Sequence, residues 1–316
     1  MTSNKKLCGL LLGGILFLAF FLTFYPKKPA SDYVLLVEER DPHFAMEVLA
    51  ENLEKNPDLE NSCHGVTHEI GNAAFEKYGF KKALTGFEDD ICGSGYMHGV
   101  TEAYIGSVEN PLEAMMTACT ESYGACFHGI GHGLLFYYKN DLPKAVAGCD
   151  LFQEKEQKVD CSEGIFMQNF NTDTRIHDNA YLKPEDTLYP CRDQEPLYKS
   201  ACYFYSPRYF LRLNEREYEE AIEVCLLAEP EYVGRCTRGV GSVTMKQNID
   251  DVQFVEKVCQ SAPEKYQIDC YAGLTSYYVI HVGSIEEAEK LCPELDENFQ
   301  KICRGTVSTS ANFFQD

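Results

Sequence analysis

The alternation of hydrophobic and polar positions along the chain predicts a series of helices. Residues 45–55 carry apolar side chains at the spacing of one helix face and end before an Asn-Pro pair, and a second helix is expected over about 59–78. Later segments open with polar or acidic residues, which suit a helix start because they complement the helix dipole. These later segments are 215–227, 251–262 and 284–295. We therefore expect an all-α protein.

The predicted helices recur with a period. A glycine in a common motif position returns mostly at steps of 30 to 35 residues, at Gly65, Gly99, Gly129, Gly164, Gly239, Gly273 and Gly305. One double interval holds a diverged copy at residues 202–205. Two helices per period of about 34 residues predict an α/α solenoid of seven or eight helix-hairpin repeats. The unit resembles the tetratricopeptide-type repeat in size only, because the Trp-Leu-Gly-Tyr pattern of that family is absent.

The recurring glycine predicts close contact between helices. Glycine costs about 0.8–1.0 kcal/mol against alanine inside a helix, so something must offset it. The glycine is also present in copies of the motif that lack histidine. We therefore expect close helix–helix approach at these positions rather than a catalytic role.

Cysteine spacing predicts a disulfide within each hairpin. The chain has 15 cysteines, and five pairs lie eleven or twelve residues apart: Cys149/Cys161, Cys191/Cys202, Cys225/Cys236, Cys259/Cys270 and Cys292/Cys303. Cys119/Cys126 is a shorter version of the same pair. Zinc ribbons need C-x-x-C knuckles, which are absent, whereas this spacing suits a bridge across a helix–turn–helix. Disulfides persist in oxidising compartments, so we expect an extracytoplasmic protein.

Two cysteines have no partner at the repeat spacing. The simplest assignment joins Cys63 to Cys92, which would link the starts of two neighbouring helices. The alternative is that Cys63, which is adjacent to His64, binds a metal as a thiolate.

The N-terminal segment has the length of a membrane span. Residues 7–25 carry no charge and are flanked by lysines on both sides. Nineteen residues of helix reach about 28 Å, enough to cross a hydrocarbon core. We expect a signal anchor over 1–28, a stalk over 29–41 and a repeat domain over 42–316, which places a single-pass protein in the cell membrane. Cleavage of the segment would make the protein secreted.

The charge balance excludes one class of partner. With 28 basic and 49 acidic residues the formal net charge is −21. A chain of this charge repels nucleic acid and anionic lipid and favours cations or basic partners. We therefore expect no nucleic-acid partner.

The candidate chemistry lies in a His-Gly-x-x-(His or Glu) motif, which occurs three times at steps of 34 and 30 residues. The copies are His64-Gly65-Val66-Thr67-His68, His98-Gly99-Val100-Thr101-Glu102 and His128-Gly129-Ile130-Gly131-His132. Residues four apart share a helix face, so each copy points two ligand-type side chains in one direction. We expect His64, His68, His98, Glu102, His128 and His132 to converge on one concave surface within 59–168 and to bind metal.

The later copies of the motif support this prediction. The same positions hold Arg238/Ser242, Ala272/Ser276 and Arg304/Ser308, so the scaffold does not need histidine for packing. The alternative is that the histidines are core residues hydrogen-bonded to tyrosine or to backbone carbonyls.

The predicted geometry of the metal site leaves two arrangements open. Neighbouring helices pack about 8–10 Å apart, so ligands on adjacent helices can share an ion. Either the helix of His98 and Glu102 lies between two ions, or a strong curve of the array forms one dinuclear centre. Imidazole with one carboxylate suits Zn, Fe, Cu or Ni. Glu163, at the equivalent position of the next copy, is an accessory candidate.

Other catalytic patterns are absent or incomplete. His68-Glu69 begins a zincin-like His-Glu-x-x-His, but Asn72 stands at the second histidine. His43, His177 and His281 are isolated and are expected to be ordinary surface or core residues. Residues 169–190 form an irregular insertion before the scaffold half 191–316, typical of a functional or mobile loop, and it is a candidate to cover the histidine face.

Two classes of function follow from these patterns. The first is a membrane-tethered metal protein, such as an oxidase, a hydrolase or a metal carrier. The second is a non-catalytic solenoid that binds another protein on its concave face. Metal bound to the purified protein separates the two, and the sequence selects no reaction.

Overall fold

The protein is helical wherever its structure is described. The computed structural model describes residues 32–55, 59–87, 89, 91–118, 125–175, 177–282 and 284–310, and these residues contain helices and no strand. The predicted all-α class is confirmed. The predicted anchor over residues 7–25 lies outside the described residues, among whose helices none has the length and apolar character of a membrane span.

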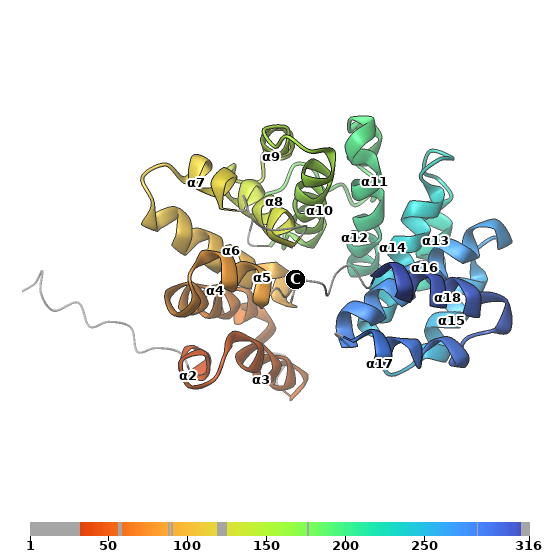
Figure 1. Cartoon of the computed structure of the whole chain (residues 1–316). Helices are drawn as coiled ribbons and strands as arrows, with labels where there is room; N and C mark the ends of the chain where they lie inside the picture. The colour runs from red at the N-terminus through yellow and green to blue at the C-terminus, as the bar shows by residue number, and fades with distance from the viewer. Residues whose placement is uncertain are drawn as a thin grey trace, which may run out of the picture.

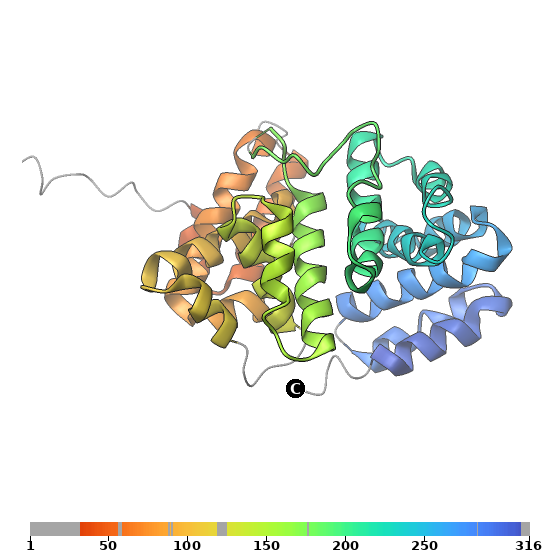
Figure 2. The same cartoon turned by 90° about the horizontal axis from the view of Figure 1, so that it is seen from above.

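A row of helices, most of them long, forms the body of the molecule (Figure 1). In chain order the helices are α4 (Glu60–Tyr78), α6 (Ile91–Ser107), α8 (Ala125–Tyr137), α10 (Lys155–Asn171), α11 (Pro196–Tyr205), α14 (Val233–Gln247), α16 (Glu264–Val282) and α18 (Glu297–Ser310). Each packs against the next one in this order. Seen from above, α8, α10 and α11 lie side by side at the centre of the molecule (Figure 2).

Further helices, most of them shorter, precede those of the row in the chain and pack against them. They are α3 (Pro42–Lys55), α5 (Phe80–Gly86), α7 (Pro111–Thr117), α9 (Leu142–Cys149), η2 (Cys191–Asp193), α12 (Pro207–Leu213), α13 (Tyr218–Cys225), α15 (Val252–Ser261), α17 (Ile285–Glu289) and η3 (Cys292–Glu294). Side-chain caps start four of them in the described part of the chain, because Asp41, Asp141, Asp251 and Ser284 each accept a backbone N–H three residues on. Such caps satisfy donors that a helix start leaves unpaired.

The segment expected to be a stalk is partly helical. Within 29–41, helix α2 (Asp32–Glu39) packs against α3 and α4. The Nζ of Lys77 donates to the carbonyl oxygens of Val37, Glu38 and Arg40 at 2.8–3.0 Å. Residues 32–40 are therefore attached to the helical body.

Disulfide bonds join shorter helices to the longer helices that follow them. The bonds within hairpins are Cys149–Cys161, Cys191–Cys202, Cys225–Cys236, Cys259–Cys270 and Cys292–Cys303, with Cα–Cα distances of 5.3–5.8 Å. Cys126 is also disulfide-bonded, and Cys119 lies outside the described residues. A further bond joins Cys63 of α4 to Cys92 of α6. Cys63 is therefore no free thiolate ligand in this structure.

Among the described residues, glycines bring four pairs of helices into backbone contact. One is the pair of α11 and α14, where a Cβ at Gly239 would overlap the carbonyl oxygen of Phe204. A Cβ at Gly99 of α6 would overlap the carbonyl oxygen of His68, and one at Gly71 of α4 would overlap that of Tyr96. The equivalent glycines are Gly131 and Gly164 between α8 and α10, and Gly241 and Gly273 between α14 and α16. The prediction of close approach is thus confirmed at Gly99, Gly164, Gly239 and Gly273. It is wrong at Gly65 and Gly305, where a Cβ would meet open space.

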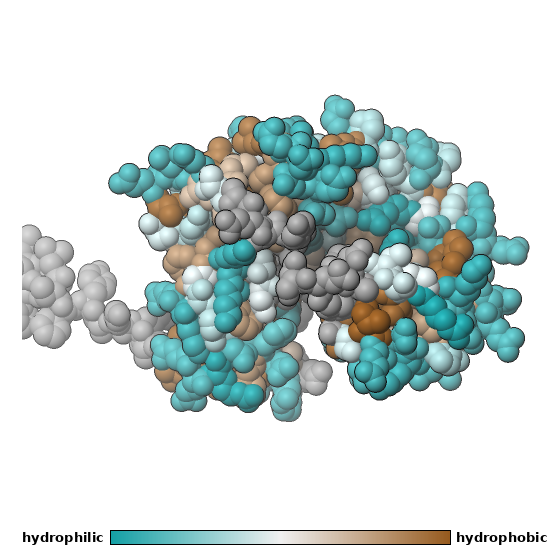
Figure 3. Space-filling model, in the orientation of Figure 1, coloured by the Kyte–Doolittle hydropathy of each residue, from teal (hydrophilic) through white to brown (hydrophobic). Residues whose placement is uncertain are grey.

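Tyrosines fill much of the core. Tyr96, Tyr198, Tyr203 and Tyr271 are among its largest fully buried side chains. Their hydroxyls still find acceptors, for example Glu229 for Tyr203 and Glu256 for Tyr271, both at 2.9 Å. The outer surface in the view of Figure 3 is mostly hydrophilic, with separated hydrophobic patches.

The irregular insertion begins slightly later than the sequence suggests. Helix α10 continues to Asn171, and no helix occurs in the described part of 172–190. Arg212 of α12 donates to the carbonyl of Thr172 at 3.0 Å, and Asn140 donates to that of Asp178 at 3.1 Å. Asn179 donates to the side chain of Asn169 at 3.1 Å. The loop is therefore attached to α10, to α12 and to the turn between α8 and α9.

Candidate metal centre

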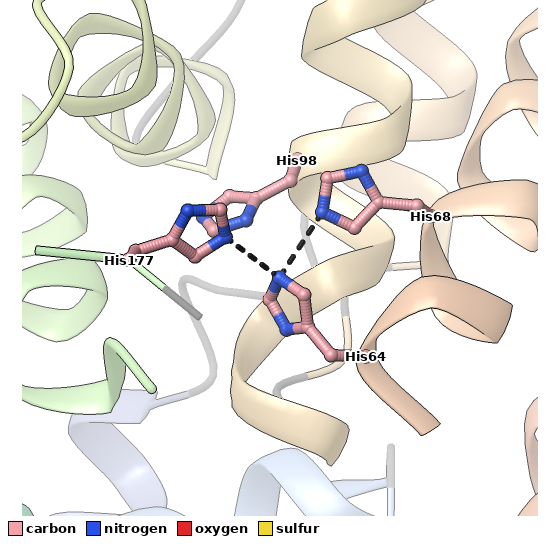
Figure 4. A group of neighbouring side chains, drawn as sticks. All are labelled: His64, His68, His98 and His177. Atoms are coloured by element: carbon pink, nitrogen blue, oxygen red, sulfur yellow. Dashed lines mark hydrogen bonds between the residues drawn. The ribbon is translucent and has the colours of Figure 1, made fainter. Parts of the chain in front are cut away.

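Four histidine side chains meet beside α4 and α6. His64 and His68 come from α4, His98 comes from α6, and His177 comes from the irregular loop. The imidazoles point toward one another (Figure 4), and one ring nitrogen from each lies within 4.8 Å of all the others. The group is therefore arranged so that it could hold a metal ion.

The two helices position three of these side chains. One turn of α4 separates His64 from His68, so their rings lie on the same face with centroids 4.8 Å apart. The close contact of Gly71 and Gly99 then brings α6 near enough for His98, whose ring centroid is 5.3 Å from both. The glycine contact thus sets the width of the site.

A backbone carbonyl determines the tautomer of His64. Its Nδ1 lies 2.7 Å from the carbonyl oxygen of Cys92 and must carry the proton, because a carbonyl only accepts. In the neutral ring, Nε2 then has a free lone pair. This Nε2 lies 3.1 Å from the Nε2 of His68 and 3.1 Å from the Nε2 of His177.

A carboxylate orients His68 in the same way. The Nδ1 of His68 lies 3.3 Å from Oε2 of Glu102, so its proton belongs on Nδ1 and its Nε2 also faces the group as an acceptor. Metal-binding histidines commonly donate their other ring N–H to a carbonyl or carboxylate, which fixes the ring and raises its basicity. Glu102, predicted as a ligand, thus lies behind His68 rather than within the four-histidine group.

The spacing of the nitrogens suits tetrahedral coordination. Metal–nitrogen bonds of about 2.0–2.1 Å place neighbouring nitrogens of a tetrahedral site about 3.3 Å apart. The two Nε2–Nε2 distances of 3.1 Å are close to that value. The wider pairs, up to 4.8 Å, need a small rotation of the rings to close on one ion.

Burial favours the neutral form of these side chains. The pKa of His98 is well below 6.5, first because the ring is buried and then because the imidazoles of His68 and His64 are near. Burial also lowers the pKa of His177 and that of His68, although for His68 the carboxylate of Glu102 acts in the opposite direction. Neutral imidazole is the form that binds metal.

A buried nitrogen of His98 is left without a hydrogen bond. The side chain is 4% exposed, and its Nδ1 has no partner among the described residues. Buried polar atoms nearly always have partners, so such an atom needs an explanation. A cation within the four-histidine group fits the residues present, because this buried ring contributes one of the four ligand nitrogens.

The structure does not bring His128 and His132 into the group. Both lie on α8, with ring centroids 5.0 Å apart, and the Nδ1 of His132 is 2.9 Å from the side-chain oxygen of Gln168 on α10. The reason is the pairing of helices: α8 makes its glycine contact with α10, whereas α4 makes its own with α6. Of the six predicted residues, the structure thus gathers His64, His68 and His98 into the four-histidine group and leaves His128 and His132 outside it.

Two further residues are placed as follows. Glu163, the accessory candidate, forms a salt bridge with Arg235 at 2.9 Å and lies outside the group. His177, expected to be ordinary, belongs to the group although it lies 113 residues from His64 in the sequence. No motif surrounds it, and the available signal was its position in the irregular insertion. His43 and His281 do lie apart, with ring contacts to Phe87 and Tyr277.

The donor set defines what the group can do. Four neutral imidazoles suit Zn, Cu, Ni or Fe, and they do not suit the oxygen-seeking ions Mg and Ca. Comparison of the chain with protein-family models, with curated proteins and with solved structures finds no match.

Proposed function

We propose that this protein binds one transition-metal ion through His64, His68, His98 and His177. The observation that carries the proposal is that the Nε2 lone pairs of His64 and His68 face each other. Cys92 and Glu102 hold the ring protons of His64 and His68 on Nδ1, so both Nε2 atoms face each other at 3.1 Å without a proton between them. Two acceptors at this distance repel unless a cation lies between them.

A proton is the alternative cation, and the surroundings disfavour it. Sharing a proton would require one of the two imidazoles to be charged. Burial and the neighbouring imidazole of His64 lower the pKa of His68 in spite of Glu102. At neutral pH a metal ion therefore relieves the repulsion better than a proton. The overall charge of −21 also favours cations near the protein.

The disulfides support an extracytoplasmic place for this site. Bonds distributed from Cys63 to Cys303 persist in an oxidising compartment. The uncharged segment 7–25 supports a single-pass anchor that holds the protein at the membrane. Within this proposal the row of helices is a helical-repeat frame that carries a metal site near its N-terminal end.

Metal analysis of the purified full chain tests the proposal. We expect about one equivalent of Zn, Cu, Ni or Fe per chain after purification or after addition of the ion and dialysis. His98→Ala should lose the metal, because it removes the buried central ligand. His281→Ala is the matched control, because His281 is exposed and lies outside the group.

A second variant separates this site from the six-residue site that the motif suggested. His128→Ala should retain the metal content of the natural protein. A chain that takes up none of the four ions would contradict the proposal. Equal loss of bound metal in His98→Ala and His281→Ala would contradict the proposal as well.

A further inference from the structure

We infer that His177 is the exchangeable ligand of this centre, so that a small anion can take its place on a metal held by the three helix-borne histidines. The inference rests on the proposed metal site and concerns what that site does. A site with three protein ligands and one position open to an outside molecule is typical of catalytic metal centres, whereas closed four-ligand sites are typical of structural ones.

The three helix-borne ligands are held rigidly. The Cys63–Cys92 disulfide joins α4 to α6 beside the site, and the Gly71–Gly99 contact joins them further along. The side chains of His64 and His98 are 5% and 4% exposed. The rings of His64 and His68 are oriented by contacts of their Nδ1 atoms, with the carbonyl of Cys92 and with the carboxylate of Glu102 respectively.

His177 is held differently. It lies on an irregular loop, it is only partly buried, and the hydrogen bond of its ring within the described structure goes to the Nε2 of His64. No carbonyl or carboxylate among the described residues fixes its other nitrogen in the way that Cys92 and Glu102 fix His64 and His68. Its ring can therefore turn away without moving α4 or α6.

The loop can release the ring while it remains attached. Its attachments lie on both sides of His177, at Thr172 through Arg212 and at Asp178 through Asn140. The backbone N–H of His177 also bonds to the carbonyl of Asp173 at 2.9 Å. Exchange of this ligand thus requires a side-chain rotation rather than a rearrangement of the loop.

The charge of the site favours an anion in the vacated position. Three neutral imidazoles leave the charge of a divalent ion uncompensated in a partly buried place. Two carboxylates near the centre are engaged elsewhere, Glu102 with His68 and Asp173, which acts on His177, with Arg175. A small anion supplies the missing negative charge and fits the space of one imidazole.

Cobalt(II) and azide test the inference on the full chain. His177→Ala should bind one Co²⁺ with a loss of affinity no larger than about 10- to 100-fold, the size of loss that outer partners of metal ligands produce. His98→Ala should lose more than this. Azide should change the visible cobalt spectrum of both the natural protein and His177→Ala. The change should occur at a lower azide concentration in His177→Ala, because azide displaces no protein ligand there. His281→Ala should behave as the natural protein does.

The outcomes separate the two proposals. Loss of Co²⁺ from His177→Ala equal to that from His98→Ala, with unchanged circular dichroism, would overturn the inference and leave the metal site standing. A cobalt spectrum that azide leaves unchanged in His177→Ala would overturn it too. A natural protein that binds no Co²⁺, Zn, Cu, Ni or Fe would overturn the proposed function itself and the inference with it.

Discussion

At the scale of single residues, the centre depends on which nitrogen of each ring carries the proton. His64 and His68 share a face because they are four apart on a helix, but that spacing says nothing of their tautomers. The acceptors Cys92 and Glu102 decide them, at 2.7 and 3.3 Å. Two neighbouring histidines can bind one metal ion when hydrogen-bond acceptors keep both ring protons on Nδ1 and leave both Nε2 lone pairs free.

Replacement of Glu102 tests this role. Glu102→Ala should lower metal affinity by about 10- to 100-fold while the stoichiometry stays at one, because the residue orients a ligand without being one. Glu102→Gln should lower the metal affinity less, since its amide oxygen can still accept a hydrogen bond from His68. Competition with a chromophoric chelator measures both variants.

The matched control is Glu109→Gln, which removes a similar charge at an exposed position just after α6. An equal effect of Glu109→Gln would show that overall charge, rather than orientation of His68, sets the affinity. Complete loss of metal in Glu102→Ala would instead make Glu102 a direct ligand.

At the scale of elements, the glycine contact between α4 and α6 determines whether three histidines can share one ion. Helices usually pack about 8–10 Å apart, and glycine permits the lower part of that range. A contact of the same kind pairs α8 with α10, which turns His132 toward Gln168 instead. The pairing of helices therefore separates two histidine motifs that look alike in the sequence.

Two glycines in neighbouring helices give a matched test. Gly99→Ala should destabilise the fold by about 1–3 kcal/mol, as overpacking does, because its Cβ would overlap the carbonyl of His68. It should also weaken metal binding, since α4 and α6 must separate. Gly65→Ala should instead stabilise by up to about 1 kcal/mol, because its Cβ would meet open space within a helix.

Urea unfolding with and without zinc measures both variants. Gly65 lies next to His64, so the comparison also shows whether any change beside a ligand disturbs the site. Equal effects of the two substitutions on stability would contradict the close contact between the helices.

At the scale of the whole molecule, the buried histidines make stability depend on pH. The pKa of His98 lies well below 6.5 in the folded protein and returns to about 6.5 on unfolding. The unfolded chain therefore binds a proton first as the pH falls, so the stability of the metal-free protein should decrease below about pH 6.5. His68 and His177 act in the same direction.

Thermal unfolding of the chelator-treated protein between pH 7.5 and 5 tests this dependence. The melting temperature should fall below about pH 6.5, and His98→Gln should show a smaller fall, because the glutamine does not titrate. Bound metal should shift this decrease in melting temperature to lower pH, because protons and metal compete for the same histidine nitrogens. A melting temperature that rises on acidification would contradict the lowered pKa of these side chains.

Much of the element-level organisation follows from the sequence alone. The 3.6-residue spacing of apolar positions predicts helices such as α3 and α4 within a few residues of their observed bounds. The separation of eleven or twelve positions between paired cysteines matches the five described bonds within hairpins. These features are local, because they depend on residues within about one helix hairpin. The periodicity of the sequence is therefore enough to predict them.

The composition of the candidate centre was decided by the tertiary structure. The motif spacing placed His64, His68 and His98 in one group, since they lie on consecutive long helices. It also grouped His128 and His132 with them, because period alone does not say which neighbours pair through glycine. His177 reaches the site from 113 residues away, on a loop whose path depends on contacts with Asn140 and Arg212. Such contacts join segments distant in the chain, and no local pattern in the sequence records them.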